Sequence, residues 1–369
     1  MLSDDDVLRL MRERVDHPAT ARELLQVLRI ARDERPAFKR RLKSLVASGA
    51  LIEIRGHRFG LPDLMNLVVG RVSINTRGFA FVDPETPDEE HPRGIYIAGN
   101  NLNQAVHGDR VVVRVEHRRD AARAEGRIVR ILERGAERIV GRYERDESGL
   151  GFVVPFDRRV MMDLQVPPAD ARGAEPGQMV LAQITRWPTP TRPALGRVID
   201  VLGALEDPGV DTAVMIAKYN LPDAHGAEAE AEARRLGDTV RPKDIRGRTD
   251  FRDWPTVTID GEHARDFDDA LSLDELPNGN YWLAVHIADV AHYVTEGSAL
   301  DADAYERGTS VYFPERAVHM FPSSLSTGLC SLNPHVDRLV QSCLMEVDRR
   351  NGRVVRTSCT MASSAAMPG

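Results

Sequence analysis

The sequence contains few cysteines, and their spacing forms no known pattern. Cys330, Cys343 and Cys359 are the three cysteines among 369 residues, and no two of them make a CxxC pair. A zinc ribbon requires such pairs, and a disulfide framework requires a higher density of cysteine. The spacing therefore argues against both kinds of site.

Long apolar runs and a basic N-terminal stretch are also missing. No window of about 18 apolar residues occurs, which argues against a membrane-spanning helix. The first ten residues, MLSDDDVLRL, are acidic, which argues against a Sec-type signal and predicts a cytoplasmic protein. The net charge of −7 disfavours a uniformly basic nucleic-acid binder, but it leaves room for local basic surfaces and for an acidic metal site.

A chain of 369 residues predicts two to four domains, and residues 1–62 are expected to form the first. Apolar residues at helical spacing mark three helices in this segment. Thr20 and Glu23 fit a capping box at the start of the second helix. The sequence LIEIRGHRFG is typical of a hairpin that turns at Gly56. Three helices followed by a hairpin predict a winged helix-turn-helix domain.

The charge of this first segment leaves two interpretations open. Residues 1–60 contain 13 Lys and Arg against 9 Asp and Glu, and the third helix carries Lys39, Arg40, Arg41 and Lys43. A basic face on such a domain indicates contact with nucleic acid. A charged helix face that is simply solvated explains the same pattern.

The sequence of residues 67–204 contains an internal repeat. VVGRVSINTRGFAFVDP (68–84) aligns with IVGRYERDESGLGFVVP (139–155), and GDRVVVRV (108–115) aligns with GQMVLAQI (177–184). Each copy has about 70 residues and consists of short alternating strands broken by Gly, Pro, Asn and Asp. This pattern predicts two small β-barrels in tandem.

Aromatic residues make up 5% of the chain, yet several fall within the first repeat. Phe79 and Phe81 are two residues apart and should share one face of a strand, where Tyr96 extends the patch. Bases stack on such rings whatever their identity, so we expect single-stranded RNA to bind there. The alternative is that one or both phenylalanines fill the barrel core. The first copy resembles the cold-shock domain; the second retains Phe152 but has Leu150 in place of Phe79.

Residues 256–270, TVTIDGEHARDFDDA, contain the strongest chemical signal. A predicted strand ends at Asp260, and Asp266, Asp268 and Asp269 follow within ten residues. Four carboxylates this close repel one another unless cations offset them, and Mg²⁺ prefers carboxylate and water oxygens. The four aspartates therefore predict a metal site suited to phosphodiester chemistry. A solvated acidic loop is the alternative; a calcium loop is disfavoured because its DxDxDG spacing is absent.

The stretch TIDGEHARDFDDA resembles the catalytic signature of the ribonuclease II family of exoribonucleases. VHIADVAHYV, RGTSVYFPERAVHMFP and LSTGLCSLNPHVDR follow in that family's order and spacing. Together with the predicted head and tandem barrels, the resemblance is strongest to the family's bacterial ribonuclease R group. It implies a multidomain α+β protein with a winged helix-turn-helix at 1–62, OB-fold or cold-shock barrels at 66–135 and 137–204, and part of an α/β ribonuclease II-type catalytic domain at 205–369.

The resemblance also implies a function. It implies a Mg²⁺-dependent hydrolase, with Mn²⁺ as an alternative ion, that degrades single-stranded or structured RNA from the 3′ end to nucleoside monophosphates. Asp260, Asp266, Asp268 and Asp269 would be the catalytic and metal-binding residues, and Tyr312 would stack near the RNA end. From its sequence context alone, Tyr312 is expected to be buried. His286, Asp289 and His292 are expected to be structural.

The resemblance ends after Arg356, which leaves the activity of the chain open. The family's catalytic domain continues further and supplies an Arg and a Glu to its active site, so we expect this chain to be truncated and catalytically impaired. A monomer without membrane contact is expected. Two alternatives remain, namely a non-catalytic RNA-binding protein and a DNA-binding regulator.

Overall fold

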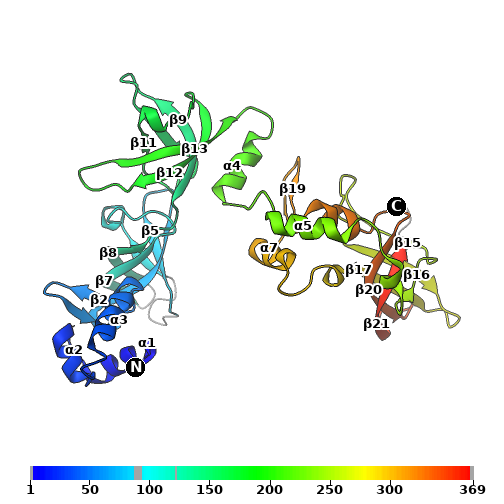
Figure 1. Ribbon diagram of the computed structural model, residues 1–369, viewed down its shortest axis with the longest axis horizontal. Helices are drawn as coiled ribbons and strands as arrows, with labels where there is room; N and C mark the ends of the chain where they lie inside the picture. The colour runs from blue at the N-terminus through cyan, green and yellow to red at the C-terminus, as the bar shows by residue number, and fades with distance from the viewer. Residues whose placement is uncertain (1–2, 87–93, 121–122, 366–369) are drawn as a thin grey trace. The chain divides into compact units, whose positions relative to one another are not determined.

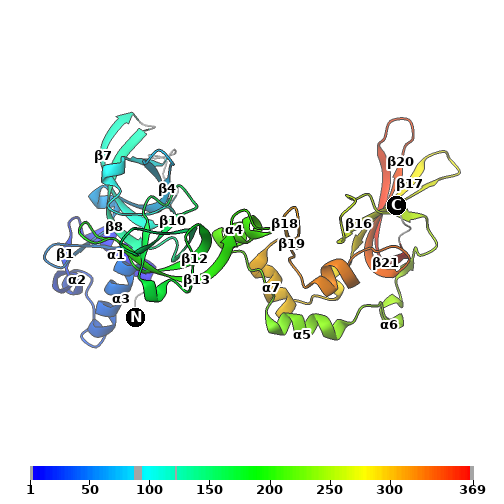
Figure 2. The same ribbon diagram turned by 90° about the horizontal axis from the view of Figure 1, so that it is seen from above.

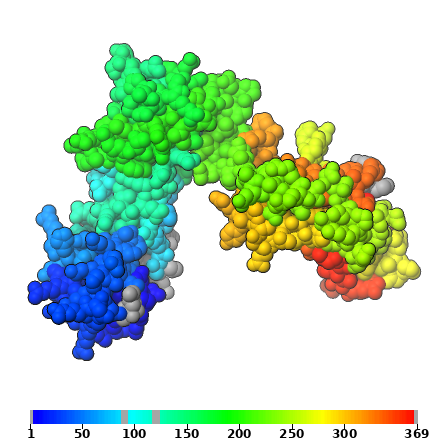
Figure 3. Space-filling model, in the orientation of Figure 1, coloured from blue at the N-terminus to red at the C-terminus, as the bar shows by residue number. Residues whose placement is uncertain are grey.

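The computed structural model describes residues 3–86, 94–120 and 123–365. Contacts divide the chain into two compact units, Met1–Lys218 and Tyr219–Gly369, and each is described by itself. Figure 1 labels their helices and strands, and Figure 3 shows their surfaces coloured along the chain.

The first unit begins with a small helical head. It contains α1 (Asp4–Arg14), α2 (Ala21–Val27) and α3 (Arg35–Ala47), with a sheet of order β1-β3-β2 made from β1 (Ala19–Thr20), β2 (Ile52–Ile54) and β3 (Arg58–Gly60). The predicted capping box is confirmed, because Glu23 accepts a hydrogen bond from the Thr20 backbone while its own N–H donates to the Thr20 hydroxyl. Gly56 makes the predicted turn at a φ of +80°.

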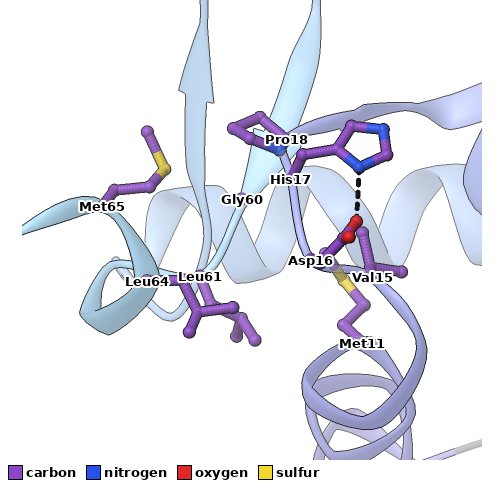
Figure 4. A pocket seen from close by; sticks show the side chains of 9 residues that line it. All are labelled: Met11, Val15, Asp16, His17, Pro18, Gly60, Leu61, Leu64 and Met65. Atoms are coloured by element: carbon purple, nitrogen blue, oxygen red, sulfur yellow. Dashed lines mark hydrogen bonds and ion pairs between the residues drawn. The ribbon is translucent and has the colours of Figure 1, made fainter.

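A small pocket lies in this head, between the end of α1 and the segment that follows β3 (Figure 4). Its volume is about 20 Å³, and its lining includes Met11, Val15 and Leu61. This space holds about one water molecule. Asp16 and His17 also line the pocket, and they contact each other at 2.6 Å.

Two closed five-stranded barrels follow the head. The first has the order β4-β5-β6-β8-β7 and the second β10-β11-β13-β12-β9. The strands of the first are β4 (Leu67–Ile74), β5 (Ala80–Pro84), β6 (Ile95–Ile97), β7 (Arg110–Asp120) and β8 (Arg123–Glu133). The strands of the second are β9 (Arg138–Arg145), β10 (Gly151–Pro155), β11 (Leu164–Val166), β12 (Gln178–Arg186) and β13 (Ala194–Ala204). The two predicted barrels are therefore confirmed.

The sequence repeat is also a structural repeat. Gly70 pairs with Pro84 in the first barrel, and Gly141 pairs with Pro155 in the second. In both places a Cβ atom on the glycine would lie 2.3 Å from a carbonyl oxygen of the partner strand. The same close approach of two backbones therefore requires glycine at both positions.

Helix α4 (Val210–Lys218) belongs to the first unit. Val210 and Val214 pack with Val140 and Met179 against the second barrel. Packing against the barrel therefore continues past residue 204, the expected end of this domain. The reason is that the apolar side of α4 covers the barrel wall.

The second unit is built on a six-stranded sheet of order β14-β21-β20-β17-β16-β15. Its strands are β14 (Thr249–Asp250), β15 (Thr256–Val257), β16 (Asp269–Glu275), β17 (Tyr281–Ala288), β20 (Asp337–Val347) and β21 (Val354–Ala365). A two-stranded sheet, β18 (Val311–Tyr312) and β19 (Ala317–Val318), lies outside it. Its helices are α5 (Ala227–Leu236), α6 (Pro242–Ile245), α7 (Ala299–Arg307) and the π-helix η5 (Ser324–Leu329), as Figure 2 shows for the first three.

The two faces of the six-stranded sheet differ in burial. Ala270, Ala284 and Ala288 point to the face that packs against α5, α7 and η5, and this layer forms the core of the unit. The alternate residues form an open face, on which Leu273 is 56% exposed and Ile287 is 47% exposed. Among the described residues, register places many apolar or sulfur-containing side chains on this open face, including Val257, Leu271, Leu273, Leu283, Val285, Ile287, Cys343, Met345, Cys359 and Met361.

Candidate functional site

The four aspartates lie in the loop between β15 and β16 and at the first residue of β16. The strand expected to end at Asp260 is shorter than predicted, because β15 stops at Val257. Ile259 is 81% exposed, so it gains no burial that would extend the strand. Asp260 and Asp266 are therefore loop residues, and Asp269 begins β16.

Hydrogen bonds hold this loop against the sheet. The buried Ser331 hydroxyl accepts from the Phe267 N–H at 3.0 Å and donates to the Arg265 carbonyl at 2.9 Å. The Asp268 carbonyl accepts from the Ala288 N–H at 2.9 Å. The backbone on both sides of Asp266 and Asp268 is thereby fixed by residues distant in the sequence.

The other three aspartates of the loop influence the pKa of Asp268. Partial burial, followed by the negative charges of Asp266, Asp269 and Asp260, raises the pKa of Asp268 above its ordinary value. A cation placed among these oxygens would relieve that repulsion. The donor chemistry fits Mg²⁺, although the described residues bring no three His, Cys, Asp or Glu side chains to metal-binding distance.

Tyr312 and His319 approach this loop from the β18–β19 hairpin and the segment after it. The Tyr312 hydroxyl donates a hydrogen bond to Asp266, which is the main reason that the pKa of Tyr312 rises to about 12. The Tyr312 side chain is 63% exposed, so the burial expected from its sequence context is wrong. Its exposed ring is available for a base to stack on.

Sequence reasoning did not find His319. Its Nδ1 lies 3.8 Å from an Asp266 carboxylate oxygen, and its ring centre lies 6.5 Å from that of Tyr312. His319 is at least 50 residues from each of the aspartates in sequence, and no local pattern marks it. Only the return of the hairpin to the loop brings it near them.

His286, His292 and Asp289 have partners within the second unit, and the contact of His292 is with Asp244 at 3.4 Å. His286 is fully buried and contacts the hydroxyls of Ser272 at 3.0 Å and Ser342 at 2.7 Å, and burial lowers its pKa to about 4. Asp289 is also buried and forms an ion pair with Arg248 at 2.7 Å. The expected structural role of these residues agrees with these contacts.

An aromatic cluster occupies the wall of the first barrel. The rings of Phe79, Phe81 and Tyr96 lie with their centres 5.6–5.8 Å apart, and Phe81 is the direct strand partner of Tyr96. None of the three is buried, and Phe81 is 39% exposed. The rings are therefore on the surface, as the stacking hypothesis requires.

The second barrel and the head contain fewer candidate contacts for nucleic acid than the first barrel. Phe152 is partly exposed, but no aromatic ring among the described residues contacts it. On α3 of the head, Arg41 forms an ion pair with Asp4 at 2.7 Å. Lys39, Arg40 and Lys43 are exposed and make no ion pair with the described part of the chain.

Three family models match this chain. The RNB domain matches residues 248–364, the ribonuclease B OB domain residues 70–131, and the cold shock domain residues 152–225. The first contains the aspartate loop and Tyr312, and the second contains the aromatic cluster. Within the part of the chain that the structure describes, no helix is long and apolar enough to cross a membrane.

Curated proteins similar to this chain include two that are named ribonuclease R. Ribonuclease R of Acidithiobacillus ferrooxidans is 40% identical over 338 residues, which cover 91% of this chain and 76% of that protein. Ribonuclease R of Thermotoga maritima is 42% identical over 345 residues, which cover 92% of this chain and 47% of that protein. The chain thus spans three quarters of one relative and about half of the other.

Solved structures show the same fold. Mycoplasma genitalium RNase R in complex with ribose-methylated single-stranded RNA has a TM-score of 0.74 at 24% identity, over 82% of this chain and 47% of that one. The same protein in complex with double-stranded RNA has a TM-score of 0.62 at 26% identity, over 73% of this chain and 44% of that one.

Proposed function

The chain belongs to the ribonuclease R family, and on that basis we propose that it is an RNA-binding protein of the 3′–5′ exoribonuclease type. The observation that carries this proposal is the aspartate loop, with Tyr312 hydrogen-bonded to Asp266. Carboxylates beside an exposed aromatic ring suit a phosphodiester whose terminal base stacks on the ring.

We propose distinct roles for the described residues. Asp260, Asp266, Asp268 and Asp269 hold divalent metal, and their combined negative charge supplies its affinity. Mg²⁺, when bound, activates water and stabilises the leaving oxygen in such hydrolysis. Tyr312 positions the RNA 3′ end, and Phe79, Phe81 and Tyr96 bind single-stranded RNA on the first barrel, with Phe152 as a weaker contact on the second.

The proposal also includes the role of the head, the cellular location and the oligomeric state. Three helices and a small sheet support a winged helix-turn-helix, whose exposed Lys39, Arg40 and Lys43 contact nucleic acid. We propose a cytoplasmic monomer that accepts single-stranded or structured RNA. The relative solved with double-stranded RNA supports the second substrate.

We expect the chain to bind single-stranded RNA more tightly than duplex DNA at a fixed salt concentration. Splayed bases can reach the aromatic cluster, whereas paired bases cannot. The measurement is fluorescence anisotropy with labelled oligonucleotides of equal length, repeated at two salt concentrations because phosphate contacts depend on salt. Equal or tighter binding of duplex DNA would support the alternative, a DNA-binding regulator.

We expect Mg²⁺ or Mn²⁺ to raise the melting temperature of the protein. A ligand that binds only the folded state stabilises it, by about 5–11 °C at 100 times Kd for a unit of this size. Asp268→Asn should reduce the shift, because it removes one of the charges that attract the ion. Asp274→Asn, which changes an exposed carboxylate further along β16, is the matched control and should leave the shift intact.

The same experiment has a stricter form. The variant with Asp260, Asp266, Asp268 and Asp269 all changed to Asn should show no metal-dependent shift. A shift equal to that of the wild type would place the bound metal elsewhere and contradict the proposed site.

A further inference from the structure

The six-stranded sheet places two of the three cysteines side by side, although their spacing in the sequence does not indicate a pair. Cys343 lies on β20 and Cys359 on β21, and the two are direct partners in the antiparallel register. Both side chains point to the open face, where Cys343 is partly exposed and Cys359 is exposed. A small reagent can therefore reach this pair.

Backbone hydrogen bonds show which kind of pair this is. The Asp289 N–H donates to the Leu339 carbonyl at 2.9 Å, and hydrogen-bonded pairs alternate along antiparallel strands. Asp289 and Leu339 are thus a hydrogen-bonded pair. Every second pair of the β17–β20 register is of the same kind, so Val285 and Cys343, four residues further along, are also a hydrogen-bonded pair. The polar backbone groups of Cys343 therefore face β17, and its pair with Cys359 is a non-hydrogen-bonded one.

This distinction decides whether the two sulfurs can join. Directly opposed residues of a non-hydrogen-bonded pair have Cα atoms about 4.5 Å apart, the closer of the two arrangements. A disulfide requires a Cα separation of about 4.4–6.8 Å, so the strands need not move apart or slide. The direct pairing of the two residues agrees with the raised pKa of Cys343, whose main cause is a side-chain hydrogen bond with Cys359.

We propose that Cys343 and Cys359 form an oxidation site that closes into a disulfide across β20 and β21 when a low-molecular-weight disulfide or another thiol oxidant is present. The exposed Cys359 thiolate attacks one sulfur of the reagent, which releases one thiol and leaves a mixed disulfide. The Cys343 thiolate then attacks the Cys359 sulfur and releases the second thiol. Two protein thiols are oxidised, and the reagent is reduced to two thiols.

Closure would fasten β21 to the sheet. β21 is held by β20 on one side and, on the other, by two register pairs with β14. A bond at Cys359 restricts the unfolded chain between the two cysteines and the separation of β21 from β20. Cys330 is buried in the core of the unit and should not react.

The test uses the full chain treated with oxidised glutathione and then digested with trypsin without reduction. We expect a protein mass about 2 Da lower and a cross-linked peptide pair, 339–349 with 357–369, in monomeric protein. We also expect the melting temperature to rise by about 5–10 °C and to return on reduction. Cys330→Ser should behave as the wild type, and Cys343→Ser should stop at the mixed disulfide on Cys359.

Other outcomes would overturn the proposal. A mixed disulfide that persists on wild-type Cys359 would show that Cys343 does not reach it. Dimers linked through Cys359 of two molecules would show that the pair forms between chains, and unreacted thiols would show that the site is closed to the reagent. The peptide map of the wild type separates these cases without relying on any variant.

Discussion

Incubation of the purified chain with a 5′-labelled single-stranded RNA and Mg²⁺ is expected to give little or no progressive shortening from the 3′ end. Phosphodiester cleavage needs positively charged groups where negative charge develops in the transition state. In the described part of the chain, the one basic side chain that comes within ion-pair distance of the four aspartates is His319, at 3.8 Å from Asp266. No Lys or Arg is placed there.

The expected loss of hydrolysis rate can be judged from other catalytic sites. Loss of a single stabilising donor costs about 10²–10³ in rate, and a 3′ end that is not held in line costs more. The wild type and Asp268→Asn should therefore give the same pattern of products, with and without EDTA. A ladder of shortened RNA from the wild type, absent from Asp268→Asn and from the EDTA sample, would show that the aspartate loop is sufficient for hydrolysis.

The double change Phe79→Ala and Phe81→Ala is expected to weaken single-stranded RNA binding by about 2–6 kcal/mol. Each base stacked on an aromatic ring contributes about 1–3 kcal/mol, and both rings lie on the barrel surface. Even the lower end corresponds to a loss of roughly 30-fold in affinity. Titration of a labelled oligonucleotide at fixed salt measures it.

Two controls separate stacking from folding. Tyr305 is 89% exposed on α7, outside the barrels, and Tyr305→Ala should leave RNA affinity unchanged. Circular dichroism and melting of the double variant should match the wild type, because Phe79 and Phe81 are not core residues. Unchanged RNA affinity in a folded double variant would move the binding surface away from this cluster.

Much of the fold was predictable because its signals are local or repeated. The Thr20 capping box depends on residues three apart, and the two barrels are marked by a repeat whose glycines meet the same backbone contact. The predicted strand ending at Asp260 was too long, because apolar residues such as Ile259 suggested burial that the fold does not provide. Alternation alone does not show which residues have a neighbour to pack against.

The candidate site was predictable only in part. The four aspartates lie within ten residues, so the sequence alone reveals the group. The raised pKa of Asp268 agrees with their closeness. His319 and the exposure of Tyr312 depend on how the β18–β19 hairpin returns to the loop, which no local spacing encodes. The pairing of Cys343 with Cys359 depends on strand register, including the irregularity between Glu346 and Val347.

The open face of the six-stranded sheet has a consequence for the life of this protein in a cell. Leu273, Ile287 and Met361 are each about half exposed on this face of the sheet, whereas monomeric proteins rarely show contiguous apolar patches of large area. Chaperones and proteases recognise surfaces of this kind. We therefore expect the abundance of the free chain to be set by quality control and turnover more than by its rate of synthesis.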